Sequence, residues 1–396
     1  MIKNIYQREK RDVLITACGI LVFFLGYLFF SSTKLHNSIF YALVLFPLLF
    51  SAQKKHFLDL HSSYLINGLL VFLFYSVCTT FWSDYYSIDL LFRTFKRFMY
   101  IYGLFLAFYI VIESYSNFPN FLLKFWTGLL SIFATISVVL FLAELHPHYS
   151  EDPNRMWGLS ALFHPSFFAT ILLAYVSGLF VYAIDMKKIN KTNNLYIFMS
   201  FYAVIQSLFV IYLADSRSAI VSIAAMLVFY GFIEGKWKWI ISIFVIGITI
   251  LCLIWQFSPE DFFGRPSYRF DIWFTFIDKW QKCSYLFGCG MNGWKTTIVQ
   301  TAMGGTHMHA HSIYIGQLHT GGIIQLFGYC AILLCFIYEA TLHKRSRPWA
   351  IVLIAGITMT LFDGSKILTT PSPLWLTLLI PMSVIAAISI TNTKKR

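Results

Sequence analysis

Charged residues are scarce in this chain. Of its 396 residues, 12% are Asp, Glu, Lys or Arg, whereas 58% are hydrophobic. Soluble domains carry roughly 25% charged residues, and half that share does not cover the surface of a globule of this length. The apolar residues also lie in long runs, which excludes a soluble enzyme, a disordered chain and a fibrous repeat. The composition therefore predicts an integral membrane protein, with runs too long for outer-membrane strands.

Several other signals are missing. The sequence shows no repeat period and no nucleotide-binding motif, and five of its seven cysteines lie in apolar runs, where they are expected as small core residues. Cys283 and Cys289 lie outside those runs, and the sequence leaves a disulfide and two free thiols equally open. The first apolar run is long and lacks a small-residue cleavage site, so we expect a membrane span rather than a cleaved signal peptide.

Twelve stretches are apolar enough to be predicted as bilayer crossings, which need about 20 residues each. They lie at 13–31, 38–52, 63–82, 98–113, 121–144, 161–184, 195–214, 218–233, 239–257, 312–338, 349–363 and 374–390. We therefore predict an all-α polytopic membrane protein of about 12 transmembrane helices. Nine spans would occupy 1–257, a cap loop 258–311, and three spans with a tail 312–396.

Lys and Arg in short loops mark the cytoplasmic side of a membrane protein. If the N-terminus lies inside, eighteen of the 30 basic residues fall in cytoplasmic segments, at 3–11, 54–55, 124, 187–191, 236–238, 344–347 and 394–396. The pattern predicts both termini in the cytoplasm and the large loop outside. The net charge of +12 is then mainly a topology signal and does not imply a nucleic-acid partner.

The other twelve basic residues lie in outer segments against this rule, and three arginines among them, Arg217, Arg265 and Arg269, are the candidates. The guanidinium fork fits phosphate oxygens, and ionisable groups at membrane depth are functional candidates. Each arginine alone is better explained by snorkelling toward headgroups, or by a pair with Asp215 or Asp271. Several arginines that converge above a lipid-facing cavity would instead form a diphosphate site.

The large loop ends in three alternate histidines, His307, His309 and His311. No carboxylate or cysteine lies nearby in sequence to complete a metal site, so metal binding is the weaker hypothesis. The stronger one makes one histidine a general base, which neighbouring arginines would keep neutral near pH 7. For each histidine the alternative is a loop side chain bonded to backbone, and we expect at least one to be of that kind.

Further candidates surround these residues. The stretch 286–294 is typical of glycine loops that hold phosphate, although such turns are common. Trp273 and Trp294 are candidates for stacking on sugar rings, with packing of the cap as the alternative. Asp363 and Lys366 are candidates for the same cavity or for a simple ion pair, and the segment 83–97 predicts an interfacial amphipathic helix.

In this order along the chain, the outer-face motifs resemble those of the O-antigen ligases, also described as lipid A–core:surface polymer ligases. Their superfamily is shared with O-antigen polymerases and pilin O-oligosaccharyltransferases. The resemblance rests on Arg217 after the seventh span, Arg269 shortly before a Trp, and a His-rich loop end followed by Tyr and Gly-Gly. The family has His-Asn at that loop end, whereas this chain has His311-Ser312. Aligning Ser with Asn makes His311 the catalytic histidine, with His309 as the alternative.

The resemblance implies a metal-independent glycosyltransferase without cofactor or nucleotide, similar to GT-C type enzymes, in the bacterial inner membrane with its active site in the periplasm. It would transfer O-antigen polysaccharide from undecaprenyl diphosphate to a sugar hydroxyl of lipid A–core oligosaccharide, with inversion, in lipopolysaccharide biosynthesis. Arg217, Arg265 and Arg269 would bind the diphosphate, and His311 would accept the proton of the acceptor hydroxyl. The partners would be these two substrates and membrane lipids.

Two other functions stay open from the sequence. An O-antigen polymerase would use the same donor with a different acceptor. A polytopic transporter would be favoured by inverted repeats, broken helices and charges near the bilayer midplane, whereas the charges here cluster at one face.

Overall fold

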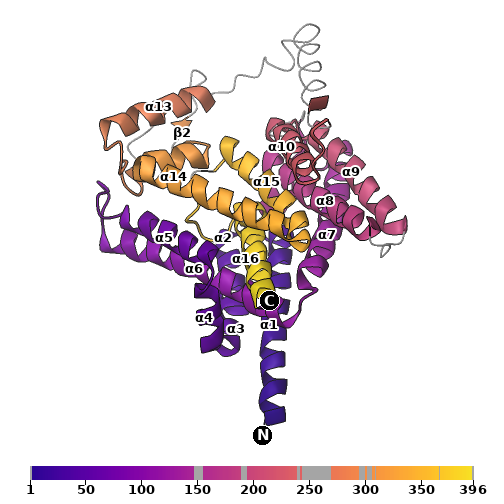
Figure 1. Cartoon of the computed structure of the whole chain (residues 1–396). Coiled ribbons are helices and arrows are strands. Elements are labelled where there is room, and N and C mark those ends of the chain that lie inside the picture. Colours follow the sequence, from indigo (N-terminus) through magenta and orange to yellow (C-terminus); the bar gives the residue numbers. More distant parts are fainter. Residues whose placement is uncertain are drawn as a thin grey trace.

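The computed structural model describes residues 2–146, 155–188, 194–238, 241–242, 269–293, 299–300, 306–307, 309–364 and 366–394. Within these ranges the chain is almost entirely helical (Figure 1). Its elements are α1 (Ile2–Phe29), α2 (Thr33–Ile39), η1 (Phe40–Leu45), α3 (Phe46–Ser51), α4 (Lys54–His61), α5 (Tyr64–Cys78), α6 (Ile88–Ser114), α7 (Phe118–Leu142), η2 (Ser160–Leu162), α8 (Pro165–Lys188), α9 (Asn194–Leu213), α10 (Arg217–Ile233), α13 (Arg269–Lys282), β1 (Val299–Gln300), β2 (Thr306–His307), α14 (Ile313–Leu342), η4 (Lys344–Ser346), α15 (Arg347–Phe362), η5 (Trp375–Leu379) and α16 (Ile380–Thr393). The two short strands pair antiparallel.

Membrane-spanning character is confirmed at the level of a polytopic helical protein. Seven of the described helices are long and apolar enough to cross a bilayer, and α4 and α5 together make an eighth candidate, bent by 86°. Eleven of the twelve predicted stretches coincide with helices, including the shorter α10 and α15. The stretch 239–257 lies almost wholly outside the described residues, so the count of twelve stays a prediction.

Burial separates central helices from lipid-facing ones. Nearly all of η5 and α16 is buried, and Trp375 is fully enclosed. On the periphery, large apolar side chains face outward, as Leu49 (75% exposed) and Tyr212 (80% exposed) do. A contiguous apolar surface of this kind suits lipid rather than water.

One prediction about local structure was wrong. The segment 83–97 was expected to form a separate interfacial helix, but α6 begins at Ile88 and continues without a break to Ser114. Ser87 caps its first turn by accepting a hydrogen bond from the N–H of Leu90. The amphipathic segment is therefore the first part of a long spanning helix.

α14 is broken in its middle. Gly321 and Gly322 leave helical geometry, with φ of −124° and 69°. The loop after α13 docks on this break: the N–H of Cys289 donates to the carbonyl of His319 (2.8 Å), and the N–H of Ile323 donates to that of Tyr285 (3.0 Å). A side chain on Gly322 would meet the carbonyl of Leu286 at 2.2 Å, so close backbone contact requires glycine here.

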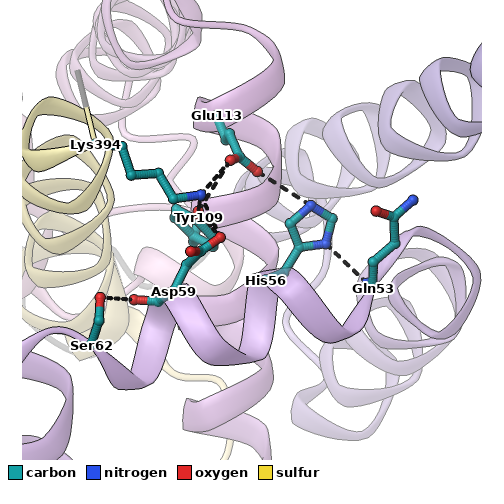
Figure 2. A network of polar contacts seen from close by, with 7 residues as sticks. All are labelled: Gln53, His56, Asp59, Ser62, Tyr109, Glu113 and Lys394. Atoms are coloured by element: carbon teal, nitrogen blue, oxygen red, sulfur yellow. Dashed lines mark hydrogen bonds and ion pairs between the residues drawn. The ribbon is translucent and has the colours of Figure 1, made fainter.

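A network of polar side chains joins three helices at the end of the bundle where the C-terminus lies (Figure 2). The ammonium of Lys394, just after α16, contacts Asp59 of α4 and lies 2.8 Å from Glu113 of α6 and 2.7 Å from the hydroxyl of Tyr109. His56 lies 3.2 Å from Glu113. The two carboxylates thus share one lysine within the network.

Candidate active site

The candidate residues lie at the starts of four helices on the opposite face. His164 directly precedes α8, Arg217 begins α10, Arg269 is the first residue of α13, and His311 directly precedes Ser312, the N-cap of α14. Free N–H groups and the helix dipole make each helix start attractive to an anion. Four such starts, marked by arginine and histidine, favour a ligand of more than one negative charge.

Two of the predicted arginines lie within electrostatic reach of one another. Burial lowers the pKa of the Arg269 guanidinium; the carboxylate of Asp363 raises it, and the positive charge of Arg217 lowers it further. Arg269 also lies over the ring of Phe362, with 5.9 Å between the guanidinium carbon and the ring centroid. Two cations that influence one another in a partly buried site favour binding of a dianionic group such as diphosphate.

A buried carboxylate lies beside the predicted catalytic histidine. Nδ1 of His311 lies 3.8 Å from Oδ1 of Asp363, whose side chain is 11% exposed, and the N–H of Gly364 donates to the same oxygen at 2.8 Å. Burial alone would raise the pKa of Asp363, but His311, the charge of His164 and the Gly364 N–H outweigh it, so the pKa lies below its usual range. The carboxylate of Asp363 therefore faces Nδ1, one of the two ring nitrogens of His311, and Nε2 is the other.

The backbone has an uncommon conformation just before two of the helix starts, those of α10 and α14. His311 has φ of 46° and Asp215 has φ of 45°, in the left-handed region that non-glycine residues seldom adopt. Each lies immediately before an N-cap serine. The hydroxyl of Ser312 accepts a hydrogen bond from the N–H of Ile315, and the hydroxyl of Ser216 accepts one from the N–H of Ala219. Strain of this kind concentrates at functional sites.

Two site residues were missed in sequence. His164 lies in a predicted span, and its Nδ1 is buried without a hydrogen-bond partner in the described part of the chain. Burial lowers the pKa of His164; Asp363 raises it, and Arg155, Arg269 and His311 lower it. Arg155 donates to the carbonyl of Ala214 (2.7 Å) and to Ser166 (3.2 Å), and so fastens the start of α8 to the turn before α10. The sequence signal that could have identified His164 was the His164–Pro165 pair near the outer end of a predicted span.

Of the remaining candidate residues, some lie within the described part of the chain and others lie outside it. His309 lies beside His311, with ring centroids 3.9 Å apart. Trp273 packs on Phe362 (6.5 Å) and Phe270 (5.5 Å), and its indole N–H is buried without a partner among the described residues, which favours the packing alternative. Arg265 and Trp294 lie outside the described residues, as does the side chain of His307.

The glycine stretch does not form a phosphate cradle. Its N–H groups already have backbone acceptors: Gly288 donates to Ser284, Gly290 to Thr320 and Met291 to Thr79. Gly288 has φ of 67°, and a side chain there would meet the backbone of Gly322 at 2.6 Å. The glycines serve contact with the broken α14, and the hypothesis of phosphate binding by this loop was wrong for these residues.

The same loop is closed by a disulfide between Cys283 and Cys289, with Cα atoms 5.2 Å apart. Of the two alternatives that the sequence left open, the structure has the bridge. Disulfides persist in oxidising compartments.

The described residues contain no group of three His, Cys, Asp or Glu side chains placed to hold a metal ion. Neither a protein-family model nor a curated protein matches the chain, so the site rests on its own geometry. That geometry joins two cations suited to a diphosphate with a carboxylate-oriented imidazole suited to proton transfer.

Proposed function

We propose that this protein is an O-antigen ligase, which transfers a glycan from a lipid diphosphate to a sugar hydroxyl of lipid A–core oligosaccharide. One observation carries the proposal: Arg217, Arg269 and the His311–Asp363 pair come from helices far apart in sequence and meet at one face of an apolar bundle. This combination supports binding of a diphosphate leaving group beside a general base.

A lipid-linked donor is supported by the surface below the site. An apolar cavity of about 570 Å³ lies between α10 and α15, lined by residues such as Phe229, Phe232 and Ile357. The same two helices carry Arg217 at the start of α10 and Asp363 just after α15. The cavity lies along the part of α10 away from Arg217, from Ala225 to Phe232, and offers an apolar surface to an isoprenoid chain.

In the proposed reaction, the acceptor hydroxyl attacks the anomeric carbon, and Nε2 of His311 accepts its proton. The bond from that carbon to the diphosphate oxygen breaks, and the lipid diphosphate leaves with the electron pair. Arg217 and Arg269, with Arg265 as a further candidate, stabilise the charge that grows on this leaving group. A single displacement inverts the anomeric centre.

The proposal includes a topology of 12 spans in the bacterial inner membrane, with both termini in the cytoplasm and the site in the periplasm. The Cys283–Cys289 bridge supports an oxidising compartment on the site's side. The basic segments 124, 187 and 344–347 lie at helix ends remote from the site, which supports the predicted sidedness.

The bent α4–α5 pair and the broken α14 are features that favour a transporter, because broken helices line transport sites. In α14, however, the break is occupied by backbone of the loop after α13, and the carbonyl of Gly321 accepts from the hydroxyl of Tyr75. A filled break supports a structural role.

The decisive experiment incubates purified protein with undecaprenyl-diphosphate-linked glycan and lipid A–core. We expect glycan on lipid A–core, with no loss of activity in a chelator. Longer glycan on the carrier lipid, without transfer to core, would identify the alternative, an O-antigen polymerase. Absence of both products from a folded protein would contradict the proposal.

A further inference from the structure

A second polar cavity lies at the end of the bundle remote from the candidate site. It has a volume of about 490 Å³ and is lined at helix ends by Asn120 of α7, Asp185 of α8, Glu234 after α10, and Arg345 and Arg347 before and at the start of α15. Three of these helices, α8, α10 and α15, carry candidate-site residues at their other ends.

The lengths of those helices place the cavity in the membrane. α8 has 24 residues, α10 has 17 and α15 has 16. At 1.5 Å per residue they span about 24 to 36 Å, close to the roughly 30 Å of a hydrocarbon core. With the candidate site at one headgroup layer, this cavity lies at the other.

Its charge is predominantly positive. Lys344, Arg345 and Arg347 line it, against Asp185 and Glu234. Glu234 is engaged by Nη1 of Arg347 at 3.0 Å. The start of α15 adds the positive end of a helix dipole, and its N-cap makes no side-chain capping bond.

Two donors in this cluster have no acceptor within the described ranges: Nη2 of Arg345 and Nε of Arg347 are both buried. Burial lowers the pKa of Arg345, yet a guanidinium stays charged at neutral pH. A buried charged donor without an acceptor is costly. Asp185 and Glu234 are anions of the same lining, so it is these two donor atoms, and not the whole cluster, that lack an acceptor.

We propose that this cavity binds the phosphate of an anionic phospholipid from the leaflet opposite the candidate site. Basic pockets between membrane helices bind such headgroups, and a guanidinium fork matches two phosphate oxygens. Ile233, Met186 and Pro348 supply the apolar part of the lining that an adjoining acyl chain contacts. The proposal does not depend on the glycosyl-transfer reaction.

The test measures thermal unfolding of the full-length protein in detergent during titration with phosphatidylglycerol. We expect a saturable rise in unfolding temperature, absent with phosphatidylcholine and with inorganic phosphate. Arg345→Gln should weaken the apparent affinity about tenfold, the order expected for one charged hydrogen bond. Lys236→Gln, an exposed lysine at the same end, should bind as the wild type does.

If Arg345→Gln does not fold, Arg345→Lys keeps the charge and removes the fork, and it should still bind several-fold more weakly. Wild-type affinity in a folded Arg345 variant would overturn the proposal. An equal response to inorganic phosphate would also overturn it, because the site would then recognise a free anion. Transfer activity is read separately, so failure here leaves the proposed enzyme untouched.

Discussion

At one end of the bundle Lys394 lies among Asp59, Glu113 and the hydroxyl of Tyr109 (Figure 2). At the other, Arg217 and Arg269 lie near one buried carboxylate, Asp363. In the first region a cation lies directly between two carboxylates, as expected where polar groups hold helices together. In the second, cations are held near each other at the starts of helices, an arrangement that an anionic ligand would stabilise. The first arrangement is that of a structural network, and the second is that expected of the proposed binding site.

The largest expected effect is on the site. His311→Ala and Arg217→Ala should each reduce glycan transfer by at least about 100-fold, the usual scale for loss of a general base or of leaving-group stabilisation. Transfer is measured with purified protein and confirmed by O-antigen attachment in a strain that lacks the native gene. Arg93→Ala, which removes a 62%-exposed arginine of α6, is the control and should stay active. Normal transfer by either site variant would remove that residue from the mechanism.

Arg269→Lys should lower transfer by about tenfold or more, because an ammonium is a point charge and does not replace the bidentate fork. The same variant also loses the guanidinium contact with Phe362. Unfolding temperature measured alongside activity separates the two effects. Wild-type transfer in a stable variant would make Arg269 a packing residue.

For the network around Lys394 we expect the reverse: a substitution should lower stability and leave transfer unchanged. Lys394→Ala leaves Asp59 and Glu113 without their shared cation. The lysine side chain is 38% exposed, so solvent screens the interaction and we expect a loss of about 1 kcal/mol in unfolding free energy. Transfer should be unchanged. Lys54→Ala, an exposed lysine at the start of α4, should cost less; an equal loss would show that the network adds no stability.

The smallest expected effect concerns pH. Burial holds the pKa of His164 below its ordinary value of 6.5. Between that lowered pKa and 6.5 the unfolded chain binds more protons than the folded one, so stability falls as the pH drops below about 6.5. His164→Gln removes this contribution, and its unfolding temperature should decline less between pH 7 and pH 5 than that of the wild type. An equal decline in both proteins would show that His164 is not held neutral.

The sequence alone was sufficient to predict those features of the structure that depend on local composition. Apolar runs located eleven helices, and arginines in outer segments located Arg217 and Arg269. Asp363 was recognised as a candidate for the same cavity, and it is the partner of His311.

Features that depend on tertiary contact were not predictable in the same way. His164 reads as part of an apolar run, and its role appears only when α8 packs beside the loop before α14. The glycines at 288 and 290 fit a phosphate loop equally well until the break in α14 provides acceptors for the neighbouring N–H groups. The stretch 83–97 has an amphipathic pattern, but pattern alone does not show that α6 continues beyond it.

The docked loop at the break in α14 has a consequence for how the protein is made. The residues from Tyr285 to Met291 are synthesised before Gly321 and Gly322, so they are present when the second half of α14 enters the bilayer. They then supply the hydrogen bonds that lipid does not offer to a broken helix. Formation of the broken helix is therefore coupled to the position of this loop, and we expect a deletion in the loop to disrupt assembly of the helical bundle.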